Sequence, residues 1–372
     1  MSGETSLTQM QLLGVASETN VAEGYPRFEP TPSQSRILAR LPAIMEHARR
    51  TPYPVLEAGA QRHFLTALGQ HSAPVASGRL ISFYSSTVAI DVAAAALARR
   101  ARVVGLVHPV IDCIPALLRS RGLTVVPVSE QSLKKGDLFE LHPEIEAVFT
   151  ANPNNPTGTV MSAPQVRRLG KLCAAAGVPL IIDQCFRAFD SRVQFDTYEL
   201  LDQTGVEYVI VEDTGKLWPT AGVKLGFLGW SRTCRLDLAE VAADVLLIAP
   251  PFSVALVEEF ARDMAAGGLD ALHDRIRQNR AILTSVLDGS SKVRVSDGTS
   301  RVSVSRLALR GGMTGTKLWG QLLRRGVHAV PCRPFYWADP VLGDRYLRIA
   351  LSREPDVVRR AGEAVRDCME RR

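Results

Sequence analysis

Apolar runs and amphipathic stretches alternate along the middle of this chain. Short runs that are apolar at nearly every position predict buried strands, and longer stretches with apolar residues every three or four positions predict helices between them. Strands of this kind, buried on both faces, are typical of a mainly parallel sheet covered by helices on both sides. The predicted strands are residues 102–108, 123–128, 146–150, 179–183, 206–211 and 225–230, with helices at 88–100, 111–121 and 164–176.

The pattern changes after about residue 250, where long helical stretches are followed by short alternating runs. This change predicts a large α/β domain over residues 36–250 and a smaller α+β domain over residues 251–372. The predicted elements of the smaller domain are helices at 254–266, 272–287, 317–325 and 355–371 and strands at 293–295, 302–308, 328–331 and 346–351.

The first 35 residues differ from both domains, because they are polar and rich in Pro, Ser, Thr and Glu. Within them, residues 7–15 have the spacing of a short helix. We interpret residues 1–35 either as a disordered tail or as an arm that folds over another part of the molecule.

Composition narrows the class of protein. With 372 residues and 46% hydrophobic content, the chain can bury the cores of two domains. The 44 basic and 38 acidic residues leave a net charge of +6. Because no run of Lys or Arg is longer than two residues, the charge indicates a solvated surface and no nucleic-acid partner. The six cysteines form no C-x-x-C pair, which argues against a disulfide framework and against a zinc site.

The sequence shows neither a membrane-spanning run nor the features of a signal peptide. No apolar run reaches the roughly 18 residues that cross a bilayer, and the polar start lacks the apolar core of a signal peptide. We therefore expect a cytoplasmic protein that does not engage a membrane.

Two ionisable residues stand at or just after the ends of predicted strands. Asp183 ends the apolar run 179–183, and Lys216 follows the run 206–211. Ligands of open α/β sheets bind at the carboxyl ends of the strands. A buried Asp needs a cationic partner, and a Lys at this edge can form an imine with an aldehyde. A structural ion pair for Asp183 and a surface position for Lys216 are the ordinary alternatives.

Other residues are suited to binding anions. Ser85, Ser86 and Thr87 open an alanine-rich helix, where free N–H groups favour a phosphate, although simple N-capping also explains them. Lys224 adds a second cation after the Lys216 segment. Arg348 stands among apolar residues, where it either pairs structurally or binds a carboxylate with both arms of its guanidinium.

The order of these residues resembles the fold-type I aminotransferases over nearly the whole chain. A phosphate-binding helix start is followed by the turn Asn-Pro-Asn-Asn-Pro-Thr-Gly at 152–158, a strand-end Asp, a Lys after the next strand and a late Arg. The resemblance implies pyridoxal phosphate (PLP) as the cofactor and no metal. It also implies an α/β fold with a mainly parallel seven-stranded sheet in the large domain, beside the smaller α+β domain.

A narrower resemblance rests on Asp-Thr-Gly-Lys-Leu-Trp-Pro-Thr at residues 213–220. Together with residues 68–71, 106–109 and 348–352, this stretch resembles the PLP- and oxygen-dependent arginine oxidases and hydroxylases of antibiotic biosynthesis, of the enduracididine-pathway type. The resemblance extends into the first 35 residues. It therefore favours the interpretation of residues 1–35 as an arm that acts as a lid over bound substrate.

The resemblance assigns the cofactor contacts residue by residue. Lys216 would form the Schiff base and shuttle protons, Asp183 would pair with the pyridinium nitrogen, and Asn155 would hold the phenolic oxygen. The other predicted cofactor-binding positions are Ser85, Ser86, Thr87 and Lys224 at the phosphate and Ile111 and Cys185 near the ring.

The resemblance also assigns the substrate contacts. Arg348 would bind the α-carboxylate of arginine, and Asp213 would bind its distal guanidinium. Tyr25 is the predicted catalytic position on the arm. The remaining predicted substrate-binding positions are Thr8, Gln11 and Glu23 on the arm and Asn155.

Several positions depart from the pattern of these oxidases, and one departs from that of ordinary aminotransferases. Tyr25 stands where the arm of the hydroxylase has a His, and Gln11 stands where it has an acidic residue. Phe186 replaces the tyrosine that aminotransferases usually have, Ile111 replaces a ring-stacking aromatic residue, and Cys185 replaces a serine. Hydroxylation, desaturation and oxidative deamination share an intermediate, so the departure at Tyr25 leaves the outcome open among them.

The predicted activity is an oxygen-consuming oxidation of L-arginine or a close relative. The product is 4-hydroxy-2-ketoarginine or a didehydroarginine, with hydrogen peroxide as the co-product. An ordinary aminotransferase and a PLP cyclase acting on a hydroxyarginine remain alternatives, which oxygen dependence separates from the oxidase. By analogy with other fold-type I enzymes, we expect a homodimer.

Overall fold

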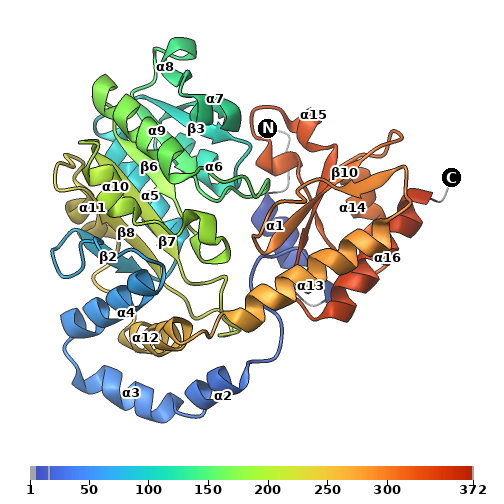
Figure 1. Cartoon of the computed structure of the whole chain (residues 1–372), viewed down its shortest axis with the longest axis horizontal. Helices are drawn as coiled ribbons and strands as arrows, with labels where there is room; N and C mark the ends of the chain where they lie inside the picture. The colour runs from blue at the N-terminus through green and yellow to red at the C-terminus, as the bar shows by residue number, and fades with distance from the viewer. Residues whose placement is uncertain (1–5, 16, 371–372) are drawn as a thin grey trace.

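The computed structural model describes residues 6–15 and 17–370, and the strands among them form one large and two smaller sheets (Figure 1). The predictions for residues 1–5 and 16 of the arm and for residues 371–372 lie outside the described part of the chain. None of the described helices is both long and apolar enough to cross a membrane.

The large sheet has seven strands and organises the first two thirds of the chain. In spatial order these are β2 (Leu80–Phe83), β8 (Gly226–Trp230), β7 (Tyr208–Asp213), β6 (Leu180–Asp183), β5 (Ala147–Ala151), β3 (Val103–His108) and β4 (Thr124–Ser129). Strand β8 runs antiparallel to both of its neighbours, and the other pairs are parallel. The predicted α/β fold with a mainly parallel seven-stranded sheet is therefore confirmed. Strand β2 was not predicted, because its four residues include the polar Ser82 and give no clear apolar run.

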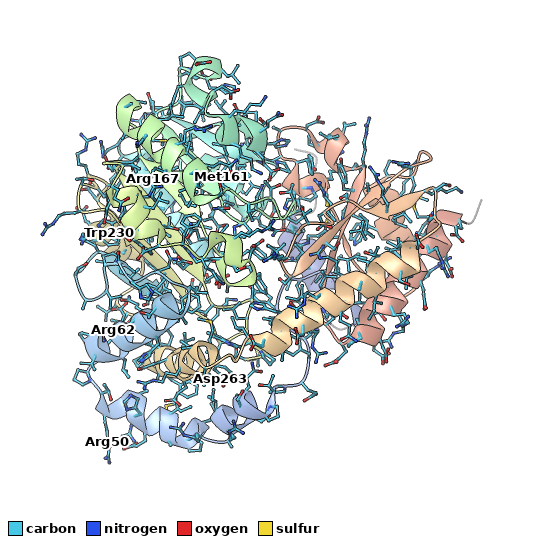
Figure 2. All side chains as sticks on the ribbon, viewed as in Figure 1. Arg50, Arg62, Met161, Arg167, Trp230 and Asp263 are labelled. Carbon is cyan, nitrogen blue, oxygen red and sulfur yellow. The ribbon has the colours of Figure 1, made fainter. Side chains whose placement is uncertain are left out.

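Helices pack around this sheet. They are α4 (Tyr53–Ala67), α5 (Ser86–Ala98), α6 (Cys113–Ser120), α7 (Glu130–Lys135), α8 (Leu138–Leu141), α9 (Ala163–Ala176), α10 (Thr197–Asp202) and α11 (Leu238–Val245). Helix α5 is buried on most of its surface, and its alanines let it pack closely against β7 and β8 on one side and α6 and α11 on the other. Figure 2 shows side chains filling the space around the sheet.

The smaller antiparallel sheet lies to one side of the large sheet (Figure 1). Its strands, in order, are β12 (Val330–Pro331), β13 (Tyr346–Ala350), β10 (Val304–Leu309) and β9 (Val293–Val295). Its helices are α13 (Asp270–Leu287), α14 (Gly315–Leu323), α15 (Pro340–Gly343) and α16 (Pro355–Glu370). The single strand predicted at 328–331 is divided, because β11 (Val327–His328) pairs with β1 (Thr19–Asn20) while β12 pairs with β13.

The two helices that follow β1 pack beside the large-sheet part of the molecule. Helices α2 (Pro32–Leu38) and α3 (Leu41–Arg50) lie along α12 (Pro251–Ala265), which also packs on α4 (Figure 1). At the end of α3, Arg50 points out into solvent (Figure 2). The elements after residue 250 therefore divide, with α12 beside the large sheet and α13 leading to the smaller one.

The N-terminal segment packs on the smaller sheet. Helix α1 (Leu7–Leu13) begins with a capping box made by Ser6 and Gln9. Its buried Leu7 and Met10 join an apolar cluster with residues of the segment 330–336. Strand β1 then pairs in parallel with β11 as a separate two-stranded sheet, so α1 and β1 both contact elements that follow residue 326.

Candidate active site

The carboxyl ends of three parallel strands meet at one edge of the large sheet. Ala151, Asp183 and Val211 lie side by side in the register of β5, β6 and β7. A cavity of about 190 Å³ opens at this edge and is also lined by residues of the arm and by Arg348 of β13. Of the residues predicted from the sequence, the cavity is lined by Thr8, Gln11, Tyr25, Ser86, Thr87, Ile111, Asn155, Asp183, Cys185, Asp213, Lys216 and Arg348.

Three predicted residues do not line this cavity. The hydroxyl of Ser85 caps α5 by accepting a hydrogen bond from the N–H of Val88 at 3.4 Å. Lys224 donates its ammonium to the hydroxyl of Tyr25 at 3.0 Å and so stays in contact with the lining. Glu23 instead forms an ion pair with Arg27, so its role at the substrate remains a prediction.

The Lys216 ammonium lies deep in the cavity and forms an ion pair with the carboxylate of Asp213. Burial, the largest single effect, would lower the pKa of Lys216, but the charge and hydrogen bond of Asp213 together with Cys185 and Asp183 more than offset burial and raise that pKa. The turn that carries both residues is tight, because the N–H of Gly215 donates to Asp213 Oδ1 at 2.7 Å. A side chain at Gly215 would meet Lys224 Cδ at 2.7 Å and Asp213 Oδ1 at 3.0 Å, so a larger residue there would have to displace the Lys224 side chain.

The carboxylate of Asp183 stands at the end of β6 and is buried. Burial raises its pKa above the ordinary value, while the hydrogen bonds from Cys185 and the charge of Lys216 oppose that effect. The backbone N–H of Cys185 donates to Asp183 Oδ1 at 2.8 Å. A buried carboxylate of this kind is stabilised by a cationic partner, which a protonated ring nitrogen would supply.

The start of α5 offers a site for a phosphate. Ser86 and Thr87 line the cavity in the first turn of this 13-residue helix, where backbone N–H groups and the helix dipole attract an anion. Ser86 also donates its hydroxyl to Asp213 Oδ2 at 3.2 Å. Strand β8 reaches the helix start because Gly226 has no side chain: a Cβ there would lie 2.3 Å from the backbone nitrogen of Ser86.

The turn that carries Asn155 is held by one carboxylate. Glu130 accepts hydrogen bonds from Asn154 Nδ2 at 2.7 Å, from Thr157 Oγ1 at 2.5 Å and from Thr159 Oγ1 at 3.0 Å. These bonds, together with the prolines of the turn, fix the position at which the side chain of Asn155 enters the cavity. Glu130 was not predicted as a functional residue, since nothing in the local pattern connects it with a turn so far along the chain.

Arg348 projects from β13 and is almost fully buried. It donates to the carbonyl of Ala22 at 2.5 Å and to Asn155 Oδ1 at 3.3 Å, and its guanidinium lies 4.9 Å from the ring centre of Phe335. Its Nε has no hydrogen-bond partner among the described residues. Burial lowers the pKa of Arg348 to about 10. A buried guanidinium with an unused donor and no carboxylate bonded to it is suited to binding a carboxylate ligand.

The structure adds Asp112, which the sequence did not indicate, and places Phe186 beside Lys216. Asp112 lines the cavity and accepts a hydrogen bond from the N–H of Leu7 at 2.9 Å, which joins the cavity wall to the arm. Burial raises the pKa of Asp112. The ring centre of Phe186 lies 5.1 Å from Lys216 Nζ. The position of Asp112 just after the predicted strand at 102–108 was the available signal, because that strand ends at the same edge of the sheet.

The donor set fits PLP. Lys216 provides an amine, Asp183 a buried acid, the start of α5 an anion site, and Asn155 an amide, and all of them border one cavity. Residues Ser85, Ser86, Thr87, Asn155, Asp183, Lys216 and Lys224 are those that could hold the cofactor.

Comparisons with curated proteins find aminotransferases. A histidinol-phosphate aminotransferase from Symbiobacterium thermophilum is 29% identical over 230 residues, which are 59% of this chain and 55% of that protein. The aromatic aminotransferase ISS1 from Arabidopsis thaliana is 26% identical over 170 residues, which are 44% and 41% of the two chains. The chain therefore spans about half the length of the curated relatives that it matches.

Solved structures match over more of the chain. The structure of MppP soaked with the product 2-ketoarginine is 40% identical, with a TM-score of 0.92, and the match covers 95% of this chain and 100% of that chain. An aminotransferase from Mycobacterium tuberculosis is 18% identical with a TM-score of 0.80 over 99% and 97% of the two chains, which shows the shared fold. The model of the family described as aminotransferase class I and II matches residues 43–365. The chain therefore belongs to the class I and II aminotransferase family and is an enzyme of the PLP-dependent aminotransferase fold.

Proposed function

We propose that this enzyme is an oxidase of L-arginine that uses O₂ as the electron acceptor. The observation that carries the proposal is the likeness to MppP, which is 40% identical over nearly all of both chains and was solved with its product 2-ketoarginine. That product retains the guanidinium and carboxylate of arginine and has a ketone where arginine has its amine. The cavity of this chain offers a group of opposite charge to each end of such a molecule.

The cofactor side of the cavity would act on the α-carbon. When bound, PLP supplies an electron sink for the bonds at that carbon. Lys216 holds the position from which an amine can bind the cofactor and carry a proton to or from the substrate. Asp183 would keep the ring nitrogen protonated, and the start of α5 together with Lys224 would hold the phosphate.

Each end of arginine would bind to a side chain of the opposite charge. Arg348 would hold the α-carboxylate, with its unpaired Nε and its Nη groups as donors. Asp213 would accept the distal guanidinium once the Lys216 amine is engaged by the cofactor. Thr8 and Gln11 add polar groups from the arm to the same cavity.

A cavity shielded from bulk solvent fits an oxidase, because reactive intermediates are then protected from unwanted hydrolysis. The arm lines the cavity on one side, and Tyr25 reaches it beside Lys224. Each pair of electrons removed from arginine would reduce one O₂ to one hydrogen peroxide. One two-electron oxidation followed by hydrolysis, in which water supplies the ketone oxygen and ammonia leaves, gives 2-ketoarginine. A further two-electron oxidation gives 4-hydroxy-2-ketoarginine, with the added hydroxyl oxygen from a second water. A didehydroarginine is the product if water does not add.

An aminotransferase is the second candidate. The family and the curated relatives named above are aminotransferases, and transamination of arginine also produces 2-ketoarginine. The two candidates differ in the electron and amine acceptor, which is O₂ in one case and a keto acid in the other.

We also propose that the enzyme works as a homodimer. Leu247 is 91% exposed, and the neighbouring Val245 and Ile248 are also exposed. An apolar cluster of this kind on the surface indicates a contact with another chain, and a second copy is the simplest partner. Sedimentation of the purified protein tests this: a single monomeric species would contradict it.

The test of the proposed activity is product analysis in air and under argon. The PLP-loaded protein is incubated with L-arginine, and the products are identified by mass spectrometry. The proposal predicts that products form in air without any keto acid and that hydrogen peroxide accumulates with them. Turnover that continues under argon and requires a keto acid would contradict the oxidase and support the aminotransferase.

A further inference from the structure

The guanidinium of Arg353 is bonded to the arm and not to a carboxylate. Arg353 follows β13 and is only 2% exposed. Its Nε donates to the carbonyl of Asn20 at 2.5 Å, Nη1 to the carbonyl of Tyr25 at 2.5 Å, and Nη2 to the carbonyl of Glu23 at 2.7 Å. All three nitrogens of one side chain therefore hold the backbone of residues 20–25.

Burying this side chain is costly for the protein. Desolvation lowers the pKa of Arg353 to about 9, against the opposing charge of Glu23. Its described hydrogen bonds all go to carbonyl oxygens, the fourth being to Ser352 at 2.8 Å. Charge-assisted bonds to three arm carbonyls offset the desolvation and fix the arm at the same time.

The segment that Arg353 holds forms part of the cavity wall. Gly24 and Tyr25 line the cavity, and Tyr25 accepts a hydrogen bond from Lys224 at 3.0 Å. Between the carbonyls bonded to Arg353 lies that of Ala22, which is bonded to Arg348 at 2.5 Å. The backbone of residues 20–25 is thus held by two guanidinium groups, one of which faces the cavity.

We propose that Arg353 is a positioning residue for substrate binding: by holding the carbonyls of residues 20, 23 and 25, it fixes the wall that the arm contributes to the cavity. Arg353 does not touch the substrate and acts through Gly24, Tyr25 and the Ala22 carbonyl. The inference rests on the proposed function in that L-arginine is the substrate whose affinity this wall sets.

Trypsin gives a direct readout of the segment. The first Lys or Arg in the chain is Arg27, so cleavage there releases residues 1–27 as one fragment. In the folded protein the backbone N–H of Arg27 donates to the carbonyl of Ser352 at 3.0 Å. The cleavage site therefore lies two residues after the backbone that Arg353 holds and is itself fixed in the folded state. Cleavage at Arg27 therefore reports release of the segment and requires no turnover.

The test compares Arg353→Met and Arg353→Lys with the wild type, each loaded with PLP. We expect Arg353→Met to be cleaved at Arg27 about tenfold faster and to show a KM for L-arginine about tenfold higher, with a smaller change in kcat. Arg353→Lys keeps the charge but cannot reach three carbonyls, so it should give intermediate values. The absorbance of bound PLP should stay as in the wild type.

Arg366→Met is the matched control. Arg366 lies on α16 and donates to the carbonyl of Val286 at 3.1 Å, and within the described part of the chain it makes no hydrogen bond to residues 20–25, so its loss should change neither readout. The inference is overturned if both Arg353 variants match this control in cleavage and in KM, or if cleavage accelerates while KM is unchanged. It is also overturned if wild-type protein is cleaved at Arg27 as fast as unfolded chain, a result that needs no variant.

The two proposals fail in different ways. If wild-type protein does not turn over L-arginine, the proposed function fails, and KM is then measured for the amino acid that it does use. The trypsin result still decides whether Arg353 holds residues 20–25.

Discussion

The cofactor side and the arm side of the cavity are built from different interactions. On the cofactor side, Asp183 and Asp213 end buried strands whose neighbours are paired along their length, so their positions are fixed by the core of the large sheet. On the arm side, only the two-residue strand β1 pairs with β11, and the carbonyls of residues 20, 22, 23 and 25 are held by Arg348 and Arg353. Segments with few apolar contacts open more easily than core strands. From this difference we expect the sheet to fix the positions of the groups that carry the chemistry and the arm to set substrate access and affinity.

The largest effect should come from the cofactor side. Lys216→Ala removes the amine that binds the cofactor and moves the proton, so we expect the rate of arginine turnover to fall by about 10³-fold or more. The measurement is steady-state turnover together with the absorbance of bound PLP. Lys171→Ala, on the exposed face of α9, is the control and should keep wild-type turnover. Residual activity within tenfold of wild type would show that another residue carries the chemistry.

Arg348→Lys tests the residue that contacts both the arm and the cavity, and its assignment to the substrate carboxylate. An ammonium keeps the positive charge but loses the forked geometry that binds a carboxylate with two hydrogen bonds. We expect KM for L-arginine to rise about 30-fold, which corresponds to ~2 kcal/mol, with a smaller fall in kcat. Agmatine, which is arginine without the carboxylate, should bind both proteins equally. A variant that loses affinity for agmatine to the same extent would contradict the assignment of Arg348 to the carboxylate.

The Lys216–Asp213 pair predicts a pH dependence for cofactor loading. The pKa of Lys216 is raised by Asp213, so near neutral pH the amine is almost entirely protonated and unreactive. Below that pKa the neutral fraction grows about tenfold per pH unit, and covalent loading of PLP by the apo-protein should accelerate accordingly between about pH 7 and 9.

Asp213→Asn should make PLP loading near neutral pH faster than in the wild type. Without the charge of Asp213, burial lowers the pKa of Lys216, so loading near pH 7 should be about tenfold faster for each unit by which that pKa falls. Stopped-flow absorbance follows both proteins. A loading rate in the wild type that does not change with pH would contradict the raised pKa.

The smallest effect should come from Tyr25→Phe. This change removes the hydrogen bond with Lys224 but keeps the ring, whose centre lies 4.4 Å from the ammonium. Because a single partly exposed hydrogen bond contributes about 0.5–1 kcal/mol, we expect KM to rise only about threefold. The products should be quantified as well. A shift in the ratio of hydroxylated to desaturated product would identify Tyr25 as more than a wall residue.

The same contrast explains how much could be predicted from the sequence. Asp183 and Lys216 were predictable because each lies at or just beyond the end of an apolar strand, a pattern that local sequence displays. Arg353 was not, since the polar segment after β13 gives no sign that its guanidinium is buried against three distant carbonyls. Asp112 and Glu130 were not predicted from the sequence for a related reason, because their hydrogen-bond partners lie far from them along the chain.

The resemblance predicted only some of the arm residues that line the cavity. The resemblance to the arginine oxidases assigned Thr8, Gln11 and Glu23 as substrate-binding residues of a lid. The structure brings Thr8 and Gln11 to the cavity but pairs Glu23 with Arg27. Backbone hydrogen bonds decide which side chains of an irregular segment face inward, and a sequence without regular periodicity does not reveal them.

An oxygen-electrode trace tests the central claim most directly. L-Arginine is added to the PLP-loaded protein in air-saturated buffer that contains no keto acid. The account predicts immediate oxygen consumption, partial return of oxygen when catalase is added, and no consumption by Lys216→Ala. A flat trace from wild-type protein that turns over arginine once a keto acid is supplied would contradict the oxidase and leave an arginine aminotransferase.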